Sequence, residues 1–184
     1  MARLIAFLRA INVGGHTVRM AELRALVEGL GFNQVETFIA SGNVLFSSRA
    51  TNLRGLERRI ESQLRTALGY EVATFVRTAE EVAAIAGYSP FRPALLKQAV
   101  ALNVAILDAT PSPEAQRSLM AHQTEVDQFH VHGREVYWLS RGRQSESPFF
   151  KIGFERALKV RATVRQLSTI RTLVAKHGLT SGSV

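Results

Sequence analysis

The chain has 184 residues, 46% of them hydrophobic and 21% charged, which is typical of one globular domain or of two small ones packed together. It contains no cysteine, which excludes disulfides, thiolate catalysis and zinc–sulfur sites and favours a cytoplasmic location. No apolar run approaches the roughly 18–20 residues of a membrane-spanning helix, so no membrane partner is expected.

Positive charge is concentrated in the last quarter of the chain. Residues 1–140 contain 14 Lys and Arg and 13 Asp and Glu, a net charge of +1, whereas residues 141–184 contain 9 and 2, a net charge of +7. Such a local excess favours phosphates, nucleic acid or anionic substrates as partners. A basic face that is simply solvated explains the same composition, so the charge indicates a class of partner and nothing finer.

The first 78 residues alternate between strand and helix patterns. A continuous apolar run predicts a buried strand, and apolar residues at helical spacing follow it up to Gly31, a residue typical of the position just past a helix end. The pair Gly42-Asn43 separates two strand-like runs and predicts a hairpin, and Gly69 ends a second amphipathic helix. The expected elements are a strand at 3–8, a helix at 20–30, strands at 35–40 and 43–48, a helix at 53–68 and a strand at 71–78.

A proline-containing connector with a short helix, at 79–98, separates this pattern from a second one with the same order. Prolines near the first turn mark the start of its first helix, and Gly133 marks its hairpin turn. The expected elements are a strand at 99–109, a helix at 111–123, a hairpin at 128–140, a helix at 148–159, a strand at 161–166 and a closing helix at 168–178.

Two β-α-β-β-α-β passes predict an α+β protein made of two tandem ferredoxin-like halves with an extra C-terminal helix. We expect the first half at 1–78, the connector at 79–98, and the second half with the extra helix at 99–184. No detailed sequence repeat accompanies the matching order of elements. Whether the two halves share one continuous sheet is left open at this point.

Four segments resemble a known family: FLRAINVGG at 7–15, VRMAELRALVEGLGF at 18–32, VETFIASGNVLF at 35–46 and KVRATVRQLST at 159–169. The chain is similar to the domain-of-unknown-function 1697 family along essentially its whole length, most specifically in the opening 46 residues. The resemblance implies a bacterial, soluble protein with a duplicated ferredoxin-like fold. It implies no established activity, substrate or catalytic residues.

The C-terminal motif departs from the pattern of that family, whose members commonly have Thr-x-Arg-Asn-Trp-x-Thr there. This chain keeps Thr163, Arg165 and Thr169 but has Gln166 and Leu167 in place of Asn and Trp. If the Asn and Trp bind a ligand, this chain binds it differently or not at all. We favour a packing role for Leu167, as a smaller apolar substitute for Trp.

The loop after the first strand is the first candidate site. Gly14 and Gly15 permit a positive φ and close backbone approach, so the N–H groups before the next helix can form a nest for an anion. Arg9 and Arg19 add charge and Asn12 adds an amide. A tight strand-to-helix turn explains the glycines equally well, and neither the Walker A nor the dinucleotide-binding spacing is present.

The hairpin at 41–43 is the second candidate. Gly42 and Asn43 suit a tight turn, and Ser41 can bond a local backbone group, so turn geometry accounts for all three. Because the first and third strands of a split β-α-β unit are adjacent, Ser41 or Asn43 can also lie near Arg9 and contribute to one anion-binding cluster.

The junction between the last strand and the last helix is the third candidate. Thr163 and Arg165 alternate onto one strand face, and Ser168 and Thr169 open a helix whose N-terminus is positive. An arginine beside such a helix end can bind phosphate through charge-assisted bonds. The alternative is a helix cap next to a solvated arginine, or one paired with Glu155.

The preferred hypothesis is a protein that binds an anionic, phosphate-bearing partner, either nucleic acid or a nucleotide. Lys159, Arg161, Arg165 and Arg171 are the residues expected to contact nucleic acid. An enzyme acting on a small phosphorylated metabolite and an oligomeric assembly protein without catalysis are the alternatives, and the oligomeric state stays open. No cofactor is predicted, and no metal, because no third ligand accompanies the histidines at 130 and 132.

Overall fold

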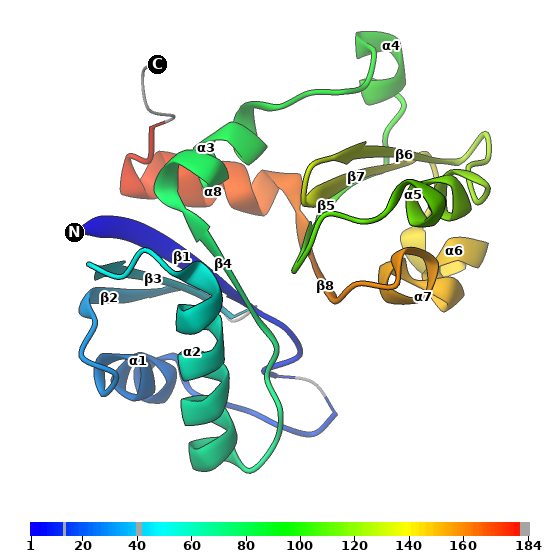
Figure 1. Cartoon of the computed structure of the whole chain (residues 1–184). Coiled ribbons are helices and arrows are strands. Elements are labelled where there is room, and N and C mark those ends of the chain that lie inside the picture. Colours follow the sequence, from blue (N-terminus) through cyan, green and yellow to red (C-terminus); the bar gives the residue numbers. More distant parts are fainter. Residues whose placement is uncertain (13, 40–41, 181–184) are drawn as a thin grey trace. The chain divides into compact units, whose positions relative to one another are not determined.

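The computed structural model describes residues 1–12, 14–39 and 42–180 (Figure 1). The chain divides into two compact units, one formed by Met1–Ala84 together with the chain from His177 onward and the other by Ile85–Lys176. Each unit contains a four-stranded antiparallel sheet with helices, which confirms the α+β class and the likeness of the two halves. None of the described helices is long and apolar enough to cross a membrane.

The first unit has a sheet in which the strands lie in the order β2-β3-β1-β4. The central strand β1 is the apolar run that the sequence indicates, and it pairs with β3 on one side and β4 on the other. Its elements are β1 (Ala2–Leu8), α1 (Met20–Glu28), β2 (Asn33–Phe38), β3 (Asn43–Ser48), α2 (Leu53–Leu68) and β4 (Thr74–Thr78), followed by α3 (Ala79–Gly87).

The second unit repeats this arrangement, with the strands in the order β6-β7-β5-β8. The central strand β5 pairs with β7 and β8. Its elements are α4 (Pro93–Leu96), β5 (Ala101–Leu107), α5 (Pro113–Met120), β6 (Asp127–His132), β7 (Glu135–Ser140), the 3₁₀ turn η1 (Gln144–Glu146), α6 (Pro148–Ile152), α7 (Phe154–Leu158), β8 (Ala162–Gln166) and α8 (Leu167–His177).

Two predicted helices differ from the observed ones. The helix expected at 148–159 is two short helices, α6 and α7, because Gly153 interrupts it with φ 74° and ψ 160°, a backbone conformation outside the helical region. The last helix begins at Leu167, directly after β8, so Ser168 lies inside its first turn rather than before it. Leu167 itself is buried, in agreement with the packing role favoured from the sequence.

Helix α2 is a long amphipathic helix with well-defined ends. Its side chains Leu56, Ile60 and Leu64 are buried in the core against the sheet. Asn52 caps its N-terminus by accepting the Gly55 N–H, and Gly69 ends it in the left-handed conformation that glycine tolerates best. The apolar face and Gly69 are the signals from which the sequence predicts this helix, whereas the Asn52 cap is seen only in the structure.

The edge strand β4 is protected along its outer side by carboxylates. Its three outward N–H groups, on Thr74, Val76 and Thr78, donate at 2.8–2.9 Å to side chains from α2 and α3. The acceptors are Glu61, Glu57 and Glu81 respectively. Capping an exposed edge in this way satisfies buried donors and prevents pairing with another strand.

Replacing Glu57 with alanine is expected to lower the free energy of unfolding by about 1–3 kcal/mol. Glu57 is 2% exposed, and its loss leaves the buried Val76 N–H without an acceptor. Urea unfolding followed by circular dichroism measures the effect. As a control, Glu71→Ala removes a carboxylate that is 83% exposed and is expected to change stability by less than about 0.5 kcal/mol. Equal losses from the two variants contradict the capping role.

The core of the second unit is aromatic, and the buried carboxylate of Asp127 forms hydrogen bonds beside it. Phe129, Trp138, Phe149 and Phe154 pack together between the sheet and the helices. Asp127, at the start of β6, is 2% exposed and accepts the indole N–H of Trp138 at 2.8 Å. It also accepts the hydroxyl of Ser147, the N-cap residue of α6, at 2.6 Å. Asp127 therefore connects the sheet to the N-cap residue of α6.

Candidate functional site

The loop between β1 and α1 is closed by bonds within the first unit. The side-chain oxygen of Asn12 accepts the Val18 N–H at 2.7 Å, and the Tyr70 hydroxyl donates to the Ile11 carbonyl at 2.9 Å. These bonds give Asn12 a structural role that the sequence did not reveal. His16 stacks on the Tyr70 ring, with 3.9 Å between the ring centroids.

The remaining candidates in this loop differ in exposure. Gly14 and Gly15 are exposed and have positive φ angles of 68° and 87°, as the sequence predicts. Arg19 is exposed at the N-cap position of α1, where its side chain makes no cap bond. Arg9 is half-buried, and its backbone N–H donates to the Ala73 carbonyl at 2.8 Å.

The hairpin candidate is mostly structural where it can be described. Asn43 is fully buried at the start of β3 and donates its side-chain amide to the Phe38 carbonyl at 3.0 Å. It pairs with Phe7 of β1, so it does lie on the strand next to the one that ends near Arg9. Ser41, the third residue of this candidate, lies outside the described residues.

The junction of β8 and α8 brings Thr163 and Arg165 together. The Nη1 atom of Arg165 donates to the Thr163 hydroxyl at 2.8 Å and to the Val164 carbonyl at 2.9 Å. Arg165 is 8% exposed, and burial lowers its pKa to about 10, so it stays charged at neutral pH. Ser168 is exposed and Thr169 half-buried in the first turn of α8.

Arg165 has a counterpart in the first unit. Arg77 occupies the same place in β4, is fully buried, and donates its Nη1 to the carbonyl of the preceding Val76 at 3.1 Å. A buried arginine in the last strand is thus a feature of both halves. This repetition favours a structural role for Arg165, in addition to the phosphate binding that the sequence predicts for it.

The other residues predicted to bind nucleic acid are partly engaged within the second unit. Arg161 is paired with Asp108 through an Nε–Oδ2 distance of 3.1 Å. Arg171 is exposed and donates its Nε to the Ala86 carbonyl at 3.1 Å. Lys159 is exposed at the end of α7.

The two histidines on β6 contact a tyrosine. The Tyr88 hydroxyl lies 2.9 Å from His130 Nε2, and the Tyr88 ring stacks on His132 with 4.2 Å between centroids. Burial, and to a lesser extent the nearby His132, lowers the pKa of His130. Within the described ranges, no group of three His, Asp or Glu side chains gathers as a metal site would need.

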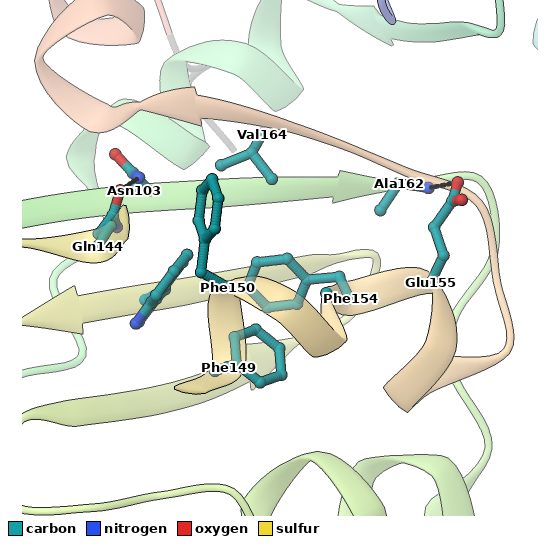
Figure 2. Close-up of a pocket in the computed structure, with 10 residues that line it drawn as sticks. Asn103, Gln144, Phe149, Phe150, Phe154, Glu155, Ala162 and Val164 are labelled. Carbon is teal, nitrogen blue, oxygen red and sulfur yellow. Dashed lines mark hydrogen bonds between the residues drawn. The ribbon is translucent and has the colours of Figure 1, made fainter. Parts of the chain in front are cut away.

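A pocket of about 230 Å³ opens in the second unit beside α6, α7 and β8 (Figure 2). Four aromatic side chains line it, three of them buried (Trp138, Phe149 and Phe154), whereas Phe150 is 59% exposed. Figure 2 shows Phe150 reaching from α6 toward Val164 on β8. Such an enclosure suits a flat apolar group.

The polar side chains of this pocket are an amide pair and a carboxylate. Asn103 on β5 donates its Nδ2 to the side-chain oxygen of Gln144 in η1. The second polar atom of each amide, Asn103 Oδ1 and Gln144 Nε2, is buried and has no hydrogen-bond partner among the residues that the structure describes. Glu155 accepts the Ala162 N–H at 3.0 Å. One donor and one acceptor are therefore unmet within the wall of the pocket, where both atoms are buried.

This pocket was missed in the sequence because its residues have the pattern of a helix and a core strand. Phe149, Phe150 and Phe154 fit one amphipathic helix, and nothing local distinguishes the exposed ring from the buried ones. Two signals were available: Gly153 in the middle of the expected helix, and Asn103 inside an otherwise apolar strand.

Comparisons with known proteins concern the family and the fold. A family model described as a protein of unknown function (DUF1697) matches residues 1–137. The solved structure of the conserved bacterial protein SP0830 from Streptococcus pneumoniae is similar, with a TM-score of 0.70 and 21% identity, over 95% of this chain and 99% of that one. At this identity the likeness concerns the fold alone. No curated protein matches. All residues lining the pocket except Asn103 lie beyond the family match.

Proposed function

Because the chain belongs to the DUF1697 family, whose description names no activity, we propose a function from the site itself: the second half binds an anionic, phosphate-bearing ligand of the nucleotide class at α6 and α7. The proposal keeps the class of partner expected from the charge of the sequence. It moves the site from the β8–α8 junction to the surface around the pocket.

One observation carries the proposal: three cations lie on, or directly after, the two short helices that supply the phenylalanine side chains of the pocket. Lys151, Arg156 and Lys159 are exposed and form no ion pair within the described part of the chain. The acid between them, Glu155, is engaged with the backbone of β8. Unpaired cations beside an apolar pocket can bind phosphate through charge-assisted bonds while a ring enters the pocket.

Binding of adenosine triphosphate tests this function. Trp138 is the only tryptophan of the chain and lines the pocket, so its fluorescence can follow the titration. We expect saturable binding that weakens as salt is raised, because exposed charges are screened. The triple variant Lys151→Glu, Arg156→Glu, Lys159→Glu is expected to weaken binding about a hundredfold, since three charge-assisted contacts are lost.

The matched control reverses three other exposed cations of the same unit: Arg92→Glu, Lys97→Glu, Arg117→Glu. This control has the same net charge as the triple variant and is expected to bind about as tightly as the unaltered protein, apart from a small long-range effect. Equal losses from both triple variants, or binding that ignores salt, contradict the proposal. A short single-stranded oligonucleotide that binds much more tightly than the nucleotide points to nucleic acid instead.

We also infer that each half is a ferredoxin-like unit in a cytoplasmic protein. The order of elements in each half and the central places of its first and third strands support this fold. The lack of cysteine supports the location. The half boundaries at 78 and 99 stay a prediction.

Among the described residues, no observation favours an enzyme or an assembly protein over a binding protein.

A further inference from the structure

The two halves differ at the middle of the outer edge of their last strands. In the first unit, Val76 pairs with Ala6 and turns its N–H outward to Glu57. In the second unit, Val164 pairs with Ala105 in the corresponding place. The alternation of the antiparallel ladder turns its N–H outward too. No described residue accepts this N–H.

The helices explain why the second edge lacks this cap. Glu61 and Glu155 occupy corresponding places, since each accepts the first outward N–H of the last strand of its unit. Four residues before Glu61 the first unit has Glu57, whereas four residues before Glu155 the second has Lys151. Moreover, the break at Gly153 separates Lys151 from Glu155. The continuous carboxylate-bearing helix of the first unit is therefore replaced by two short pieces.

This replacement exposes apolar surface. Leu56 and Val76 are 1% and 0% exposed in the first unit. Phe150 precedes Glu155 by five residues, as Leu56 precedes Glu61, but it has no such cover and is 59% exposed, while Val164 is 39% exposed. Both side chains line the pocket (Figure 2). An apolar opening in one half, closed in the other, indicates a place for a ligand.

The amide pair specifies the chemistry of that ligand. Asn103 is 6% exposed, so its unpartnered oxygen carries the cost of a buried polar atom without a hydrogen bond. Gln144 leaves a donor in the same state. If both amides are turned over, the pair still leaves one donor and one acceptor unmet. Because both amide atoms are buried, the two amides have to turn toward the pocket before they can meet a ligand. With the Val164 N–H, they then offer it two donors and one acceptor.

We propose that this pocket holds a planar heteroaromatic ring of the nucleobase class, bound between aromatic side chains and recognised at its edge by Asn103, Gln144 and the Val164 N–H. The inference rests on the proposed function and names the part of the ligand that enters the protein. A cavity of about 230 Å³ is smaller than the sites of whole drug-sized ligands, about 300–1,000 Å³, so it takes one ring system. The phosphate lies outside it, toward the exposed cations.

Two other occupants fit less well. A hydrocarbon ring fills the apolar space but leaves all three polar groups unmet. A peptide strand added to the edge of β8 needs alternating free N–H and carbonyl groups. Here the Ala162 N–H is taken by Glu155 and the Val164 carbonyl by Arg165, so little of the edge is available.

Uncharged probes measure the binding of the ring without any contribution from a phosphate. Adenosine, guanosine, cytidine and uridine are titrated against the full chain with Trp138 fluorescence as the signal, and toluene serves as a ring without a polar edge. At least one nucleoside is expected to bind about tenfold more tightly than toluene. Gln144→Ala and Phe150→Ala are each expected to weaken that nucleoside about tenfold, whereas Gln128→Ala, an amide deletion elsewhere on the same sheet, leaves it unchanged.

The outcomes distinguish this inference from the function on which it rests. If adenosine triphosphate binds with salt dependence but no nucleoside binds and Phe150→Ala has no effect, the ring site is wrong and the proposed function stands. If a nucleoside binds as tightly as its triphosphate, the ring site stands and the phosphate role fails. Binding of toluene equal to that of every nucleoside overturns the edge recognition. No binding of any probe overturns both.

Discussion

Replacing Phe149 with alanine is expected to lower the free energy of unfolding by about 3–5 kcal/mol, the cost of removing a buried aromatic side chain. Phe149 is 2% exposed, and its ring centroid lies 4.5 Å from that of Phe129 and 4.9 Å from that of Phe154. Its loss leaves a cavity that these rings can fill only in part. Urea unfolding followed by far-ultraviolet circular dichroism measures the change.

The neighbouring Phe150 is the matched control. Because its side chain is 59% exposed, Phe150→Ala is expected to change stability by less than about 0.5 kcal/mol, although it removes one wall of the pocket. The pair therefore separates folding from binding: one variant loses stability, and the other loses affinity for ring-containing probes. Comparable destabilisation by both variants contradicts the arrangement of α6.

Replacing Asp127 with alanine is expected to lower the free energy of unfolding by about 2–4 kcal/mol. The change removes the acceptor of the Trp138 indole N–H and of the Ser147 hydroxyl, both of which are buried. Hydrogen bonds to a charged acceptor contribute about 1.5–3 kcal/mol each, and their donors are left unsatisfied. A shift in Trp138 emission is expected in the folded variant, because the indole loses its partner.

Two further variants test the same contacts of Asp127. Asp127→Asn keeps one acceptor oxygen and is expected to lose about half as much stability as the alanine variant. Glu125→Ala removes an exposed acid two residues earlier and is expected to cost less than about 0.5 kcal/mol. If Asp127→Ala is as mild as Glu125→Ala, the aspartate does not hold α6 to the sheet.

Most elements of the fold could be predicted because their signals are local. The apolar run of β1, the leucine and isoleucine stripe of α2 and the glycines at 31 and 69 each depend on neighbours within a few residues. Spacing failed at Gly153, where a single glycine turns one expected helix into two. A sequence pattern shows which face of a helix is apolar, but it does not show whether the chain continues as one helix.

The candidate site was predicted less well, because charge and glycine patterns do not reveal which side chains are already engaged. Asn12 and Arg165 were singled out for anion binding, yet each makes hydrogen bonds that hold its own loop or strand. Lys159 was predicted as a phosphate contact and is exposed. Lys151 and Arg156 become candidate phosphate contacts only because the helices on which they lie also line the pocket.

The order of residues alone determines an α+β class, a duplicated order of elements and an excess of positive charge near the C-terminus. These properties follow from periodicity and composition, which act over short stretches of chain. The pocket depends on contacts between residues far apart: Asn103 with Gln144, Asp127 with Trp138 and Ser147, and the absent carboxylate opposite Val164. Such contacts exist only after strands and helices have packed, so they were beyond the reach of local patterns.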